Sequence, residues 1–149
     1  MNPLWLGALA GAFLAGALIA LQAPTNAMLS RAVGSPVNAA MVSFAVGLVA
    51  LLLTALALGA RPQAAEMRAL PWYAWTGGLY GAVFVAIAAF AAPRMGVTLF
   101  LIVAIGGQLA MALLLDRTGA FGLPVQEVTL PRLGGVLLVI AGAWLVQQR

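Results

Sequence analysis

The chain has no cysteine or histidine, and few of its residues are charged. Without cysteine and histidine it cannot form disulfides, thiolate nucleophiles or the usual zinc and haem ligand sets. Charged residues make up only 7% of the 149 residues, whereas soluble domains carry about one quarter. Hydrophobic residues make up 64% and the mean hydropathy is +1.10. No water-soluble core needs so much apolar surface, so the composition predicts an all-α integral membrane protein.

Five apolar segments approach the length of a membrane-spanning helix, which needs about 20 residues to cross roughly 30 Å of hydrocarbon. The second segment has a clear start, because Ser35 can cap the helix and Pro36 suits its first turn. The fifth is short, and snorkelling by Arg132 and Arg149 would extend it. We therefore predict a single transmembrane domain over residues 1–149, with spans at about 4–28, 36–58, 75–92, 97–115 and 132–148.

The seven basic residues are all arginine, and they are spread between the apolar segments. With five spans, one membrane face carries Arg61, Arg68, Arg117 and Arg132, and the other carries Arg31, Arg94 and Arg149. Such a small difference gives no strong instruction for orientation under the positive-inside rule. Because the number of spans is odd, two oppositely inserted copies would form an inverted pair. The sequence predicts an antiparallel homodimer of ten helices, and insertion in one orientation, alone or with a paralogue, stays open.

The first span carries the most chemically distinctive residues of the chain. Gln22 and Asn26 are four residues apart and share one helix face. Pro24 lies between them, has no N–H to donate and crowds the carbonyl of Ala20, which predicts a helix break. Broken membrane helices often bind substrates or ions. Gln22 and Asn26 are therefore candidate substrate-binding residues, and the alternative is that they bond to neighbouring helices.

Three further polar residues lie within predicted spans. Gln108 is near the middle of the fourth span, where a carboxamide must find a partner or face water, so it is the third candidate binding residue. Asn38 and Ser43 in the second span are only secondary candidates for binding. Side chains of this kind readily bond to the backbone of their own helix, so a structural role is favoured for them. Arg94 follows Pro93 at the end of the third span and is expected to anchor that end at the membrane interface.

No ionisable residue is expected near the middle of the bilayer. This disfavours carboxylate-based proton exchange and a buried counter-ion for a cationic drug. It also disfavours an intramembrane enzyme, which needs a general base, a nucleophile or a metal. We expect no cofactor, no bound metal and no nucleic-acid partner. Two classes of function remain, a small-solute transporter and a non-transporting membrane scaffold or accessory subunit.

Several short motifs recur in the order and spacing of one family. They are Gln22-x-Pro24-x-Asn26, Ser43-Phe44-x-x-Gly47, Pro71-Trp72-Tyr73-x-Trp75-x-Gly77-Gly78-x-x-Gly81, Gly107-Gln108 and Asp116-x-x-Gly119-x-Phe121-Gly122. With them the chain resembles the YdcZ-like family of small bacterial inner-membrane proteins, within the drug/metabolite transporter superfamily. Tyr73 stands where that family commonly has a second tryptophan.

The resemblance covers nearly the whole chain and implies a half-sized, five-helix version of the ten-helix transporters. It implies export as the activity, the bacterial inner membrane as the location, and no particular substrate. By the same resemblance, Gln22, Pro24, Asn26 and Gln108 would line or shape a central pathway. The leading expectation is therefore a transporter or exporter that works by alternating access around the first and fourth spans.

Overall fold

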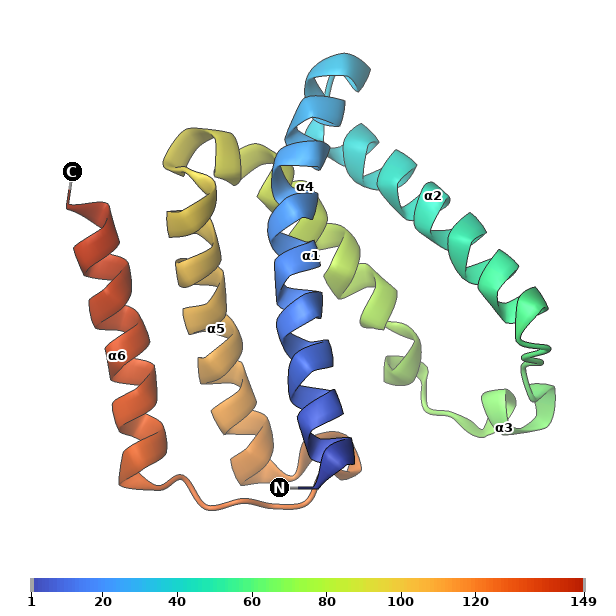
Figure 1. Cartoon of the computed structure of the whole chain (residues 1–149). Coiled ribbons are helices and arrows are strands. Elements are labelled where there is room, and N and C mark those ends of the chain that lie inside the picture. The colour runs from blue at the N-terminus through green and yellow to red at the C-terminus, as the bar shows by residue number, and fades with distance from the viewer. Residues whose placement is uncertain (1, 149) are drawn as a thin grey trace. The chain divides into compact units, whose positions relative to one another are not determined.

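The computed structural model describes residues 2–148, and these form helices joined by turns and loops (Figure 1). The α-helices are α1 Pro3–Val33, α2 Pro36–Ala57, α3 Ala64–Ala69, α4 Gly77–Met95, α5 Val97–Thr118 and α6 Leu130–Gln147, with 3₁₀ turns η1 Trp72–Trp75 and η2 Ala120–Gly122. Five helical segments are long and apolar enough to cross a membrane: Pro3–Val33, Pro36–Ala57, Trp72–Met95, Val97–Thr118 and Leu130–Gln147. The prediction of an all-helical chain with five candidate spans is confirmed. Arg149, expected to extend the fifth span, lies outside the described residues.

The first helix is longer than predicted and does not break at Pro24. α1 continues without interruption through this residue to Val33, where Gly34 ends it in the left-handed conformation at φ 84°. A proline costs the helix only its own N–H bond if neighbouring groups compensate, as Ser and Thr side chains do in membrane helices. Here Pro24 leaves the Ala20 carbonyl without its helical N–H, and the Thr25 hydroxyl donates to the neighbouring carbonyls of Leu21 (3.1 Å) and Gln22 (2.9 Å). The predicted helix break is therefore wrong.

The turn between α1 and α2 is closed by neutral polar groups. The Ser35 hydroxyl accepts a hydrogen bond of 3.0 Å from the backbone N–H of Asn38, so the predicted cap is confirmed. The Asn38 carboxamide donates to the Val33 carbonyl at 2.9 Å. These two bonds satisfy backbone groups at the end of one helix and the start of the next.

The described residues divide into two compact units, one ending at Arg94 and the other beginning at Met95. In the first unit α1 packs against α2, and in the second α5 packs against α6. Ala23, Asn26 and Ala27 are buried on one face of α1, and α4 buries a similar run of small residues. Small side chains let helix backbones approach closely where lipid cannot drive them together. The buried α2 and α4 residues are Ala39, Ala40, Val85, Ala88, Ala89 and Ala92.

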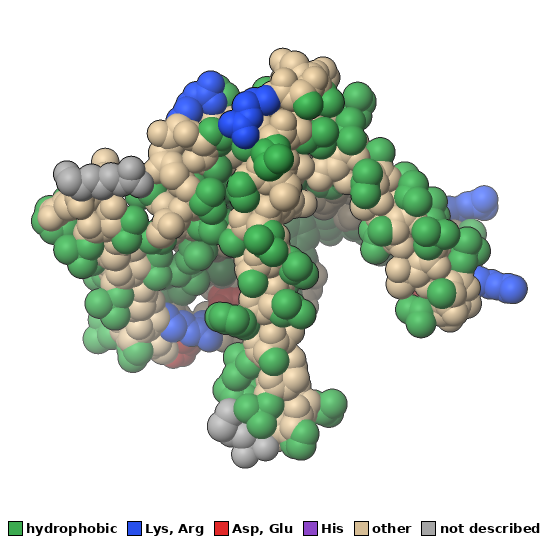
Figure 2. All heavy atoms as spheres, turned by 45° about the horizontal axis from the view of Figure 1, so that its top comes forward, with side chains coloured by type: hydrophobic (Ala, Val, Ile, Leu, Met, Phe, Trp, Pro, Cys, Tyr) green, Lys and Arg blue, Asp and Glu red, His purple; other side chains and the backbone are tan. Residues whose placement is uncertain are grey.

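Most large apolar side chains of the spans are exposed. Hydrophobic side chains cover the helices along their visible length, and arginine side chains appear at a few separate places (Figure 2). Phe13, Leu56 and Leu138, on three different helices, are each at least 74% exposed. A surface of this kind is stable when lipid or a partner helix covers it. The apolar surface of these helices therefore suits a membrane environment.

Candidate functional site

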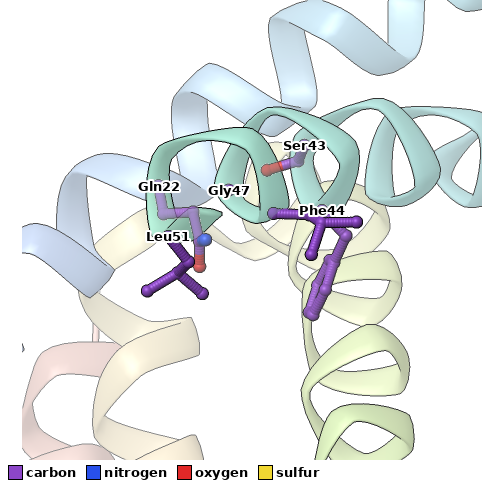
Figure 3. Close-up of a pocket in the computed structure, with 6 residues that line it drawn as sticks. Gln22, Ser43, Phe44, Gly47 and Leu51 are labelled. Atoms are coloured by element: carbon purple, nitrogen blue, oxygen red, sulfur yellow. The ribbon is translucent and has the colours of Figure 1, made fainter. Parts of the chain in front are cut away.

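A pocket of about 290 Å³ lies between α1 and α2 (Figure 3). α1 contributes Gln22, which is half-buried. α2 contributes Ser43, Phe44, Gly47, Leu48 and Leu51. Ser43, Gly47 and Leu51 are spaced by four residues and so share one face of α2. Gly47 has no side chain to fill the space between the helices. The pocket thus follows from the pattern of polar, small and large residues on that face.

The lining is mostly hydrocarbon with two neutral polar groups, the Gln22 carboxamide and the Ser43 hydroxyl. Neither group has a hydrogen-bond partner among residues 2–148, and no ionisable side chain lines the pocket. Free polar groups on an apolar wall are what a small-molecule site uses to orient its ligand. Within the same described part of the chain, no three His, Cys, Asp or Glu side chains gather into a group that could hold a metal.

Asn26 lies one helical turn beyond Gln22 on the same face of α1. It is the buried polar residue of the described chain, with only 4% of its surface exposed. Its Nδ2 atom has no hydrogen-bond partner among the described residues. An unpaired buried amide costs about 1–3 kcal/mol, so native proteins seldom keep one without a use. Asn26 does not line the α1–α2 pocket, but it adds an unsatisfied donor to the same stretch of α1.

The other predicted residues have different surroundings. Asn38 is bound to the Val33 carbonyl and helps to close the turn between α1 and α2. Gln108 belongs to the second unit, where it is exposed on α5. The structure therefore brings Gln22 and Ser43 to one pocket, places Asn26 one turn away, and gives Asn38 a bond within the turn.

Phe44 is a pocket residue that was not among the sequence candidates. Its ring also meets α4, because a β-carbon built on Gly81 would lie 3.1 Å from Phe44 Cζ. The same ring lines a second pocket of about 400 Å³ in the first unit, where the other walls are apolar side chains of α2 and α4. The available signal was its place in the Ser43-Phe44-x-x-Gly47 motif, next to a candidate polar residue.

A different kind of pocket lies between α5 and α6. It measures about 310 Å³, and its walls include Asp116 and Arg132 among apolar and small residues. These two side chains form an ion pair of 3.2 Å. Arg132 also donates to Gln126 Oε1, and the Gln126 backbone N–H donates to the Asp116 carbonyl at 2.8 Å. The charged groups of this pocket thus bind one another and the connecting loop.

The Arg94 side chain contacts Phe90 in two ways at the end of α4. Its guanidinium lies 3.7 Å from the centre of the Phe90 ring and donates to the Phe90 carbonyl. The residue is exposed and belongs to the last turn of the helix. A cation near a helix C-terminus is favourably placed for the helix dipole, and stacking on an aromatic ring adds to this. These contacts agree with a role in holding the helix end.

Comparison with protein families matches residues 7–145 to the family described as "Putative inner membrane exporter, YdcZ". None of the curated proteins and none of the solved structures compared with the chain matches it. Membrane export is not an enzyme class, and five apolar helices fit a multi-pass protein. The motifs that pointed to this family in the sequence lie within the matched region. The chain therefore belongs to the YdcZ family and is a multi-pass protein of the inner membrane.

Proposed function

We propose that the chain is a small-solute transporter that works by alternating access around Gln22 and Asn26 of the first span and Gln108 of the fourth. One observation carries the proposal: the α1–α2 pocket holds the unpartnered polar groups of Gln22 and Ser43, one turn from the unpaired donor of Asn26. The family's description as an exporter supports the same class of function.

The rival is a membrane scaffold or accessory subunit. In a scaffold, polar residues of the spans serve the fold by bonding to their own or neighbouring helices. Thr54 does this, with its hydroxyl 2.9 Å from the Ala50 carbonyl, and Asn38 does so at the turn. Gln22, Ser43 and Asn26 have no such bonds among the described residues. Their free hydrogen-bonding capacity favours binding over scaffolding.

The test is a screen of small solutes for flux in vesicles that contain the purified protein. For a solute that is transported, Gln22→Ala and Asn26→Ala should each lower flux by about tenfold, the equivalent of one or two lost hydrogen bonds. Gln108→Ala tests the fourth span in the same way. Thr54→Val, which removes a hydroxyl bound within its own helix, is the matched control and should transport normally. Parallel losses of folded yield and flux in the Gln22 and Asn26 variants would instead favour the scaffold.

We further propose that two copies of the chain associate as an antiparallel homodimer of ten helices. The odd number of candidate spans supports this, because oppositely inserted copies are then related as inverted repeats. The near-equal division of arginines between the two faces also supports it, since neither orientation is strongly preferred. Arg149, which counts in that division, lies outside the described residues. An oppositely inserted paralogue would be the alternative partner.

Dual insertion can be tested because the chain has no cysteine of its own. A single Gln148→Cys change allows an impermeant thiol reagent to label the C-terminal tail from outside intact cells. Dual insertion predicts about half of the labelling that is reached after permeabilisation. Lysines added after Arg149 should draw the tail inward and reduce outside labelling. Complete labelling, or none, would rule out the antiparallel homodimer and leave a parallel assembly or a paralogue.

A further inference from the structure

We infer that the α1–α2 pocket takes an uncharged solute with an apolar body and at least one hydrogen-bond acceptor. The inference rests on the proposed function, since it names the class of substrate for the same site. It excludes cations and anions as preferred substrates. Three features of the pocket carry it: the charge of its surroundings, its free hydrogen-bonding groups and its apolar walls.

The pocket offers no counter-charge. Its lining has no ionisable side chain, and the nearest one along α1 is Arg31, about 13 Å further along the helix. The two spans that form the pocket hold no Asp, Glu, Lys, Arg or His over residues 4–30 and 36–58. Taking an unpaired ion out of water into such a site costs several kcal/mol. An ionic solute would therefore bind far more weakly than a neutral one of the same shape.

The free hydrogen-bonding groups of the pocket favour a solute that carries a hydrogen-bond acceptor. The Gln22 carboxamide and the Ser43 hydroxyl can both donate and accept, and both are unpartnered among residues 2–148. A carbonyl, ether or hydroxyl oxygen on the solute would satisfy one of these donors. A plain hydrocarbon would leave all of them unpaired.

The apolar walls and the volume of the pocket determine the size and polarity of the rest of the solute. Phe44, Leu48 and Leu51 present hydrocarbon, and Gly47 leaves space against the helix backbone. A volume of about 290 Å³ is at the small end of ligand pockets, which run from about 300 to 1,000 Å³. It suits a compact body such as a fused pair of aromatic rings better than a long acyl chain. A neutral, compact and amphipathic molecule meets all three conditions.

A thiol placed in the pocket can report its occupancy. Ser43→Cys exchanges oxygen for sulfur in the lining, and the rate of its modification by N-ethylmaleimide can be followed in the reconstituted protein. Ser30→Cys on α1, also half-buried but outside the pocket lining, is the matched control. The probes share one skeleton and differ in charge: 2-naphthamide, 2-naphthoate and 2-naphthylmethylammonium at neutral pH.

The neutral amide should protect Ser43→Cys at a concentration at least about tenfold below either ion, and it should not protect Ser30→Cys. Adding Gln22→Leu to the Ser43→Cys chain should raise the protecting concentration of the amide by up to about tenfold, the equivalent of one hydrogen bond. Protection by an ion at an equal or lower concentration would overturn the inference about charge and leave the proposed function intact. If none of the three probes protected, the pocket would not be a binding site, and the proposed function would fail with the inference.

Discussion

The α1–α2 pair of the first unit and the α5–α6 pair of the second are both helical hairpins with a pocket of similar size, yet their polar chemistry differs. The α1–α2 turn is short and closed by neutral groups of Ser35 and Asn38. The connection from α5 to α6 runs over residues 119–129 and is held by the Asp116–Arg132 ion pair and by Gln126. Charged side chains therefore stabilise the longer connection, and neutral polar side chains stabilise the short turn.

The same contrast separates the two pockets. In the α5–α6 pocket the polar side chains of Asp116 and Arg132 are already paired with each other. In the α1–α2 pocket the polar side chains of Gln22 and Ser43 have no partner within the described chain. Paired groups stabilise a fold, whereas unpaired groups on an apolar wall are available to a ligand. This difference is why we assign binding to α1–α2 and a structural role to the polar groups of α5–α6.

The largest loss of stability is expected from Gly119→Ala, a change in the connection of the second hairpin. Gly119 has φ +62°, and a β-carbon there would lie 2.7 Å from Val125 Cγ2 and 3.1 Å from the Leu123 carbonyl. The strained backbone and the contact together should lower the free energy of unfolding by about 2 kcal/mol. Denaturant titration of the purified protein in mild detergent measures this. Gly134→Ala, where a β-carbon meets nothing within 4 Å, is the control and should not destabilise.

A smaller effect is expected from Ser35→Ala in the short turn of the first hairpin. The change removes the hydroxyl that accepts from the Asn38 N–H, and loss of such a cap typically costs about 1 kcal/mol. The same titration applies, with Ser30→Ala as the control, since Ser30 caps no helix. An equal loss in both variants would show that the turn does not depend on this hydrogen bond.

These two sites show what could be predicted from sequence. The Ser35 cap could, because a serine before Pro36 and an apolar run is a local pattern. The five candidate spans could as well, since apolar length is read directly from the chain. The course of α1 through Pro24 could not, because a proline removes only one hydrogen bond of the helix, and the local rule does not tell whether a long membrane helix continues past that loss.

Contacts between distant residues were the harder part. Asp116 and Arg132 are 16 residues apart, and their pairing depends on how the connection folds back. The spacing of each residue within its own span indicated only a helix end. Phe44 meets Gly81 through the packing of α2 on α4, which no periodicity reveals. Polar candidates such as Gln22 stand out in an apolar span, whereas the apolar residues that shape the pocket around them do not.

Gly81→Ala should act on the wall of the first unit's pockets. The new methyl group would lie 3.1 Å from Phe44 Cζ, so the ring must move. Displacing a side chain from its rotamer costs about 0.5–1.5 kcal/mol, but the ring borders open pockets and can turn at the low end of that range. Gly78→Ala on the same helix is the control, because a β-carbon there has no neighbour within 4 Å. It measures the stability that alanine alone adds to the helix. We expect Gly81→Ala to be less stable than Gly78→Ala by about 0.5 kcal/mol. No difference between them would mean that Phe44 does not press on α4.

The ion pair itself is expected to contribute little to stability. The side chains of Asp116 and Arg132 are 33% and 39% exposed, and exposed pairs contribute only about 0.2–1 kcal/mol. Arg132→Gln should therefore cost less than Gly119→Ala, and the loss should shrink as salt is added, because salt screens exposed charges. Exchanging the two residues, Asp116→Arg with Arg132→Asp, should recover part of the stability that either single change loses. If the single changes cost nothing at any salt concentration, Gln126 and the backbone hold the connection, and the contrast between a charged and a neutral hairpin would concern the pockets alone.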